Sequence, residues 1–268
     1  MIAKLIGVRP GEGNIVFRLG GHAFLILAAT TIYYTAAEAL FLSHFDAELL
    51  PLPFLSGAIL SLLLSVAYEK LQRKWRAGRL SLILVLFLAS FLSLLLFLVK
   101  GGIPGGPFLL LAAAPMSGVL LRVENLGFFS RSLDTRAQKR LFATVGILGG
   151  LGAVCGGLVA AGLTWRVHVE HLPWISVGLI LFSSLLLQGT SAKLRPRTSP
   201  HAASWGEVVR HRFALLLCLL ILFMSILSTV IRYQLGASLK ESELSPDGMA
   251  SYLGMLNAGI NLCAVLFQ

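Results

Sequence analysis

Eight apolar runs of helical length, separated by short polar segments, set the pattern of this chain. About 20 residues cross the hydrocarbon core of a bilayer at 1.5 Å per residue, which is close to the length of these runs. The second run is the shortest, but it can continue as a helix to Leu71 with Glu69 and Lys70 at the interface. The pattern predicts an all-α, polytopic transmembrane helix bundle. The predicted spans are 21–42, 52–67, 80–99, 108–128, 141–164, 172–190, 213–233 and 249–267.

Composition supports a membrane protein. Hydrophobic residues make up 56% of the chain and charged residues 13%, with a mean hydropathy of +0.83, whereas a soluble domain carries about 25% charged residues. Lipid is therefore the expected partner for much of the surface. The net charge of +10 does not indicate a nucleic-acid partner, because the basic residues lie in short clusters between apolar runs and not on one face of a soluble module.

The basic clusters also predict the orientation. Loops that stay in the cytoplasm are enriched in Lys and Arg. With the N-terminus inside, the outer loops carry only Lys100, Arg166 and Lys240, and Arg122 and Arg232 fall within spans. The remaining 17 of the 22 basic residues are then cytoplasmic. We expect an integral protein of a bacterial-type inner (plasma) membrane with a cytoplasmic N-terminus.

One long connection divides the chain. Residues 191–212 are basic and contain Pro196 and Pro200, which predicts a cytoplasmic linker. We expect a six-helix bundle over 1–190 and the first two helices of a second bundle over 213–268. Paired repeats are a common transporter plan, so the sequence indicates a six-plus-six protein that is cut short in its second half. A natural six-plus-two arrangement is the alternative.

The loop after the second span resembles a transporter motif. Residues 65–74 read SVAYEKLQRK, which is similar to the G-x-x-x-D-R-x-G-R-K/R loop of the major facilitator superfamily, although both glycines are replaced. An acid at a helix end followed by bases can latch one bundle to another by charge-assisted bonds. The alternative is a basic anchor of the ordinary cytoplasmic kind. The latch residues expected here are Glu69, Lys70, Arg73 and Lys74.

A second segment narrows the resemblance. Residues 134–142 read DTRAQKRLF, and a glycine-rich helix follows. This is similar to the nucleotide-exchange-carrier-like branch of the same superfamily, which is related to ATP/ADP carriers. The resemblance implies that Asp134 and Arg136 also belong to the latch, and that the solute is a nucleotide or a related metabolite.

The glycines also carry a prediction without any family. They form a small-residue stripe at helical spacing, which lets two helix backbones approach closely in lipid. A phosphate-binding loop is not indicated, since no G-x-x-x-x-G-K-S/T motif is present. We expect the following residues to serve helix packing: Gly146, Gly150, Gly152, Gly156 and Gly157.

Polar side chains within spans are the candidate substrate ligands, because each charge costs about 2.5 kcal/mol or more at the bilayer centre. Structural alternatives are an Arg122–Glu124 ion pair, snorkelling of Arg232 or Glu38 to the interface, and hydrogen bonding of the asparagines between helices. We further predict that Glu38 and Arg122 line a water-accessible path. The predicted substrate-binding residues are Glu38, Arg122, Asn125, Asn257 and Asn261.

No enzyme, cofactor or metal is expected. The three cysteines are far apart in apolar runs, which does not fit a disulfide framework or a metal site. His168, Glu170 and His171 lie together in a short loop with no further ligand nearby, and we interpret them as ordinary loop residues. A membrane enzyme would need a His/Asp or Ser/His/Asp set near one interface, and the sequence indicates none.

The sequence therefore predicts a secondary active transporter of a polar or anionic solute that works by alternating access. Arg122 could offer a positive charge to an anion. The alternative is a non-transporting membrane sensor or anchor, whose helical bundle carries a regulatory domain beyond Gln268.

Overall fold

The computed structural model describes residues 9, 12–75, 77–188 and 212–267, and these residues form helices and turns without a strand. Eight of the helices are long and apolar enough to cross a membrane. The predicted all-α transmembrane bundle is thereby confirmed: the protein is an integral membrane protein of eight candidate spans. The spans are α2 (Gly13–His44), α3 (Pro51–Lys74), α4 (Ala77–Lys100), α5 (Gly106–Ser132), α6 (Thr135–Leu163), α7 (Leu172–Gln188), α9 (Arg212–Glu241) and α10 (Pro246–Leu266), with short turns η1 (Ala47–Leu49) and η2 (Val169–His171).

Most helices extend beyond the predicted apolar runs because local signals set their ends. α3, α5 and α10 each begin with a proline in the first turn, where the missing N–H costs nothing. Asp134 caps α6, and its Oδ1 accepts a hydrogen bond of 3.0 Å from the Ala137 N–H. Ser245 caps α10 in the same way through Gly248. The apolar pattern thus predicts which residues lie in the membrane, and the capping residues determine where each helix begins.

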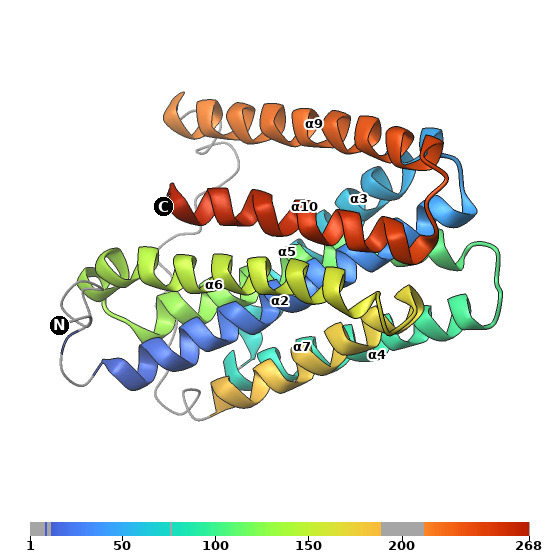
Figure 1. The fold of residues 1–268 in the computed structure, drawn as a ribbon. Coiled ribbons are helices and arrows are strands. Elements are labelled where there is room, and N and C mark those ends of the chain that lie inside the picture. Colours follow the sequence, from blue (N-terminus) through green and yellow to red (C-terminus); the bar gives the residue numbers. More distant parts are fainter. Residues whose placement is uncertain (1–8, 10–11, 76, 189–211, 268) are drawn as a thin grey trace.

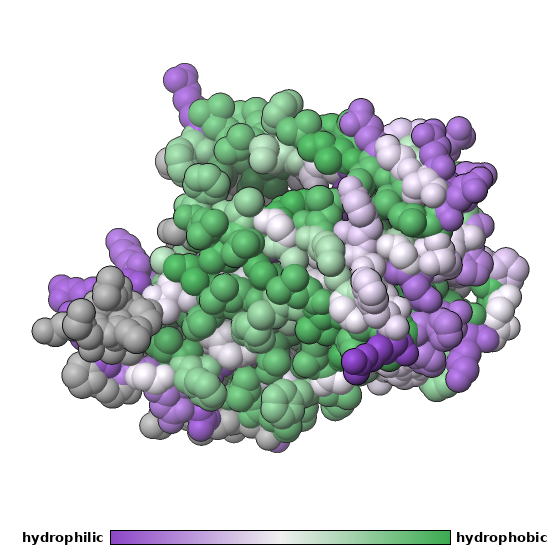
Figure 2. All heavy atoms as spheres, viewed as in Figure 1, coloured by the Kyte–Doolittle hydropathy of each residue, from purple (hydrophilic) through white to green (hydrophobic). Residues whose placement is uncertain are grey.

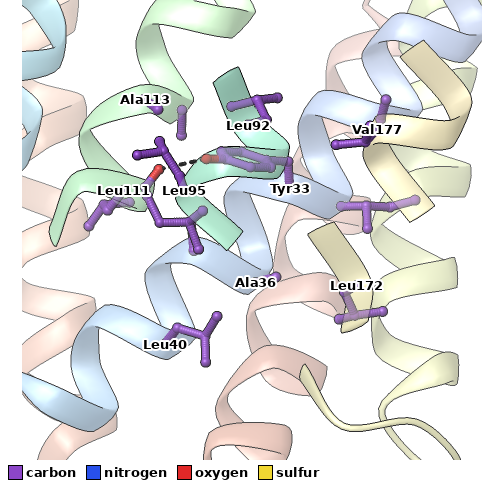
Figure 3. Packing of buried hydrophobic residues seen from close by; sticks show 14 of the residues in the cluster. Tyr33, Ala36, Leu40, Leu92, Leu95, Leu111, Ala113, Leu172 and Val177 are labelled. Carbon is purple, nitrogen blue, oxygen red and sulfur yellow. Dashed lines mark hydrogen bonds between the residues drawn. The ribbon is translucent and has the colours of Figure 1, made fainter. Parts of the chain in front are cut away.

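The helices run nearly side by side, with α2 at the centre of the bundle (Figure 1). α2 packs against α5, α6, α7 and α10. Tyr33 of α2 is buried at its middle, where its hydroxyl donates a 2.9 Å hydrogen bond to the Leu110 carbonyl (Figure 3). This satisfies the polar atom of a side chain that otherwise packs among apolar residues. Figure 3 shows around it Leu92 and Leu95 of α4, Leu111 and Ala113 of α5, and Leu172 and Val177 of α7.

The face of the molecule drawn in Figure 2 is apolar over a broad band, with polar residues gathered toward the two ends. Many large apolar side chains of the spans are more than half exposed, such as Leu94, Phe97 and Leu185. A soluble protein rarely exposes so large a contiguous apolar surface. Lipid contact accounts for the band.

Two ends of the bundle are used below as reference points. α2 begins, α5 ends and α6 begins at one end, which we call the basic end because Arg131, Arg136, Lys139 and Arg140 lie there. η1, η2 and the turn between α9 and α10 lie at the other end, which we call the turn end (Figure 1). The assignment of the basic end to the cytoplasm stays a prediction.

The last two helices differ in how they join the other six. α10 lies against both α6 and α2. α9 stands apart along most of its length and meets the bundle only near the turn end (Figure 1). Gly236 and Leu239 are its buried residues, and Gly236 faces Leu50 and Leu42. The predicted linker 191–212 lies almost wholly outside the described residues, so the domain boundary stays a prediction.

Candidate functional site

Polar side chains inside the spans gather in two places. The first, which we call the Glu38 cluster, comprises Tyr34, Thr35, Glu38, Arg232, Asn257 and Asn261 and joins α2 to α9 and α10. The second, the His22 cluster, comprises His22, Ser81, Glu124 and the Ser183 carbonyl and lies within the first six helices.

An ion pair crosses from α2 to α9 in the Glu38 cluster. Arg232 Nη1 donates to Glu38 Oε2 at 3.2 Å. The same guanidinium lies 4.5 Å from the centre of the Tyr34 ring, in cation–π geometry. Tyr34 in turn stacks on Phe54 of α3 at 6.2 Å. Arg232 is thus held by a carboxylate and an aromatic face, and the alternative of simple snorkelling to the interface does not describe it.

Glu38 is fully buried, and only one of its oxygens is paired. Its exposed fraction is 0%, and Oε1 has no hydrogen-bond partner among the described residues. A buried carboxylate without enough partners is costly. Oε1 is therefore the atom in the Glu38 cluster at which a hydrogen bond from a proton, a water molecule or a solute group would be most favourable.

The asparagines of α10 complete the Glu38 cluster. Asn257 Nδ2 donates to Thr35 Oγ1 on α2 at 3.1 Å, and Asn261 Nδ2 donates to the Asn257 carbonyl at 2.7 Å. Thr35 lies one turn from Glu38 on α2. Both of the last two helices are thus tied to α2 through polar atoms. Asn257 makes the hydrogen bond between helices that the structural alternative describes, whereas Asn261 bonds within α10.

Arg122 and Asn125 lie elsewhere. Arg122 of α5 is exposed on the bundle surface, and Asn125 is half-buried with Oδ1 unpaired. Glu124, two residues from Arg122 on α5, contacts His22 of α2. His22 is 16 residues before Glu38 on the same helix, which is a distance of roughly 24 Å at 1.5 Å per residue. The structure therefore does not bring Glu38 and Arg122 together. Arg232, which the sequence analysis left as a snorkelling residue, stands beside Glu38 instead.

The sequence alternative of an Arg122–Glu124 ion pair is wrong. Glu124 is fully buried and accepts a hydrogen bond from Ser81 on α4, while its other oxygen lies 3.2 Å from His22 Nε2. Residues two apart on a helix point in different directions, so Arg122 faces outward. The sequence analysis did not weigh His22, although a histidine inside an apolar run was a signal that could have found it.

The His22 cluster contains the residue types of a hydrolytic triad in a different order. Ser81 donates its hydroxyl hydrogen to Glu124, whereas His22 bonds to the other oxygen of Glu124 and to the Ser183 carbonyl. A nucleophile needs its base within hydrogen-bond reach. The hydroxyl here points at the acid, so His22 is not placed to activate it.

Of the expected latch residues, Asp134 lines an open hollow of about 910 Å³ at the basic end. Arg131 of α5 donates to Gln72 of α3 at 3.2 Å beside this hollow, and Lys139 also lines it. This contact joins two helices of the first six. Glu69, Lys70 and Arg136 are exposed. The side chains of Arg73 and Lys74 lie outside the described residues, so the latch between bundles stays a prediction.

The turn end carries two polar contacts that the sequence analysis did not predict. Asp247 at the start of α10 accepts a 2.7 Å hydrogen bond from the Val169 N–H and lies 3.2 Å from His168 Nδ1. Lys240 of α9 donates to the Phe45 carbonyl at 2.6 Å and pairs with Asp46 at 3.1 Å. We call these the turn-end contacts. They close the last two helices onto the loops of the first six.

The glycine stripe of α6 divides between two neighbours. Cβ atoms on Gly152 and Gly156 would collide with the α2 backbone, and one on Gly157 would collide with the α10 backbone. Gly150 faces Val265 of α10, and Gly146 is half-buried. Small residues thus let α6 lie against two helices at once.

Comparison with known proteins gave no match: no family model, no curated protein and no solved structure matches this chain. The resemblance to the major facilitator superfamily therefore rests on the sequence motifs alone.

Proposed function

We propose that the protein is a secondary active transporter that moves a polar or anionic solute by alternating access. The observation that carries the proposal is the Glu38–Arg232 pair, which spans the boundary between α2 and α9 and leaves Glu38 Oε1 unpaired in a buried place. Charged groups within spans are costly and mark solute or ion pathways. A pair placed where two groups of helices meet can open when those helices move.

Arg232 supplies the recognition chemistry. A guanidinium binds carboxylate or phosphate groups through two parallel hydrogen bonds. An anionic solute that takes Arg232 in this way displaces Glu38, which then needs a proton or another cation in place of the guanidinium. Solute binding and cation uptake would in this way be linked at one site.

The arrangement of α9 fits such a cycle. The turn-end contacts hold α9 and α10 at one end, while α9 stands apart from the bundle toward the basic end (Figure 1). Alternating access requires one end to open while the other closes around the solute. In this proposal the structure represents the state that is closed at the turn end.

The experiment is uptake into proteoliposomes by the purified chain, using radiolabelled nucleotides, inorganic phosphate and dicarboxylates as the first panel. Glu38→Gln and Arg232→Gln should each lose at least about tenfold in uptake, the size expected when a charge-assisted bond to the solute is removed. Arg166→Gln, an exposed arginine in the turn before η2, is the matched control and should transport normally.

The double variant Glu38→Gln/Arg232→Gln separates transport from structure. Removing one member of a buried pair destabilises a protein, whereas removing both is close to neutral. We expect the double variant to recover the thermal stability that each single variant loses while uptake stays lost. Normal uptake in the single variants, or no uptake of any solute by the parent, would contradict the proposal and favour the non-transporting sensor.

A further inference from the structure

His22 is fully buried where α2, α4, α5 and α7 meet, near the basic end of the bundle. Its two ring nitrogens contact two different acceptor groups, the Ser183 carbonyl and the Glu124 carboxyl. We propose that His22 and Glu124 form a proton-binding site inside the helix bundle, with one exchangeable proton held between them.

The hydrogen-bond geometry fixes the proton count. Nδ1 lies 3.2 Å from the Ser183 carbonyl oxygen, which can only accept, so Nδ1 carries a hydrogen. Nε2 lies 3.2 Å from Glu124 Oε2. Without a proton between these atoms, two lone pairs would face each other in a dry site. One proton therefore occupies this contact, either as a carboxylic acid donating to the ring or as an imidazolium donating to a carboxylate.

The rest of the His22 cluster allows this proton to leave. Ser81 donates its hydroxyl hydrogen to Oε1, which stabilises the carboxylate form of Glu124. Release transfers the proton to a water molecule as hydronium, leaves neutral His22 beside carboxylate Glu124, and lowers the charge of the site from zero to minus one. The lone pairs of Nε2 and Oε2 then repel, so proton release loosens the contact between α2 and α5.

The site lies close to the hollow at the basic end. Val123 and Gly127, which flank Glu124 on α5, line that hollow together with Gln72. Tyr68 lies beside Gln72, one turn away on α3, and within electrostatic reach of both Glu124 and Arg131. Tyr68 and Gln72 thus bring polar groups to the side of the site that faces the hollow.

The charged groups on the helices around the site bond to other partners or lie at the surface. Arg131 is the cation that acts on the same Tyr68 as Glu124 does, whereas Arg18, one turn before His22, bonds to Asn14, and Arg140 of α6 pairs with Glu12. Arg79 of α4 is exposed, and α7 has no titratable side chain. No cation among the described residues neutralises Glu124 directly, so the proton is the cation that the site holds.

The test is nitrogen NMR of the full-length protein in lipid nanodiscs, with 15N-histidine as the only label. The chain has six histidines, and the signal missing in His22→Gln identifies His22. We expect the His22 Nε2 chemical shift to change from that of a nitrogen that shares a proton with Glu124, in either arrangement, to that of a bare nitrogen as the pH is raised through the range from about 5 to about 9. The measurement needs no solute, so it stands or falls separately from the transport proposal.

Ser81→Ala distinguishes a proton-binding site from a purely structural pair, because only a proton-binding site would change the midpoint of its pH transition. It removes a donor to the carboxylate, so the proton should be held more tightly and the midpoint should rise by about one pH unit. Glu124→Gln should abolish the transition at that midpoint. Glu170→Gln, which removes an exposed carboxyl beside His171, is the control and should leave it unchanged.

An Nε2 signal that stays constant across this pH range in the parent overturns the proposal and makes the pair a fixed structural contact. The same conclusion follows if Ser81→Ala folds normally and leaves the midpoint in place. If Glu124→Gln does not fold, the parent and Ser81→Ala decide the question together.

Discussion

Gly157 of α6 and Gly254 of α10 lie back to back. A Cβ atom on Gly157 would lie 2.6 Å from the Gly254 carbonyl oxygen, and one on Gly254 would lie 2.7 Å from the Gly157 carbonyl oxygen. Both distances are well below van der Waals contact, so neither position can carry a side chain without moving a backbone. This reciprocal contact fixes α10 against the first six helices, and Asn257 reaches Thr35 of α2 from that position.

The first prediction concerns this helix contact. Gly157→Leu and Gly156→Leu should each lower the yield of folded protein and its melting temperature in detergent, because the new side chain meets the backbone of α10 or α2. Overpacking of this kind costs about 1–3 kcal/mol or more. Size-exclusion chromatography and thermal unfolding measure the effect.

The control for that prediction is Leu158→Phe, because Leu158 is 55% exposed on the same helix. If all three variants were equally stable, the glycine faces of α6 would not be close contacts in the membrane.

The second prediction concerns the turn-end contacts. Asp247→Asn should lower stability and open the turn end, because it weakens the hydrogen bond to the Val169 N–H and the contact to His168. A hydrogen bond to a charged group contributes about 1.5–3 kcal/mol. Thermal unfolding measures the loss of stability. Faster labelling of a cysteine at position 251 measures the opening of the turn end.

His168→Gln is the matched variant for Asp247. The His168 side chain is 83% exposed, and exposed pairs contribute little. His168→Gln should therefore melt at the same temperature as the parent, which would show that the hydrogen bond from the Val169 N–H to Asp247 contributes most of the stability at this contact. A larger loss in His168→Gln than in Asp247→Asn would reverse this ranking.

The third prediction tests orientation. In a chain from which Cys155, Cys218 and Cys263 have been removed, a cysteine at position 166 should react with an impermeant thiol reagent in intact cells. A cysteine at position 79 should react only after permeabilisation, because basic loops stay in the cytoplasm. Labelling of position 79 from outside intact cells would invert the topology.

The fourth prediction is a pH dependence at the start of α2. The Arg9 backbone N–H and the Arg140 guanidinium lower the pKa of the Glu12 carboxyl below its ordinary value of 4.5. A lowered folded pKa contributes stability above the unfolded value, and this stability is lost as the pH falls through the folded value. The melting temperature of the parent should therefore exceed that of Glu12→Gln at neutral pH, and the difference should vanish in acid.

Glu48→Gln, a change at an exposed carboxyl in η1, is the control for Glu12. Its difference from the parent should stay near zero over the same pH range. A parent and a Glu12→Gln variant that melt together at neutral pH would show that the Arg140 contact contributes nothing in the membrane.

The sequence by itself determined the fold class and the number of spans. Apolar runs of about 20 residues must become helices in lipid, because every backbone N–H and C=O has to be satisfied within the segment. The same reasoning marked Glu38, Asn257 and Asn261 as unusual, since polar groups in a span are costly wherever they point. Such conclusions depend on one segment at a time and need no knowledge of neighbours.

The tertiary structure decided which of these groups meet. Glu38 pairs with Arg232 and not with Arg122, and Glu124 pairs with His22, a residue more than a hundred positions away. Periodicity within a helix gives the direction of a side chain relative to its own axis only. The rotation of each helix and the order in which helices pack depend on close contacts such as Gly157 with Gly254, and those contacts join segments that the sequence pattern treats separately.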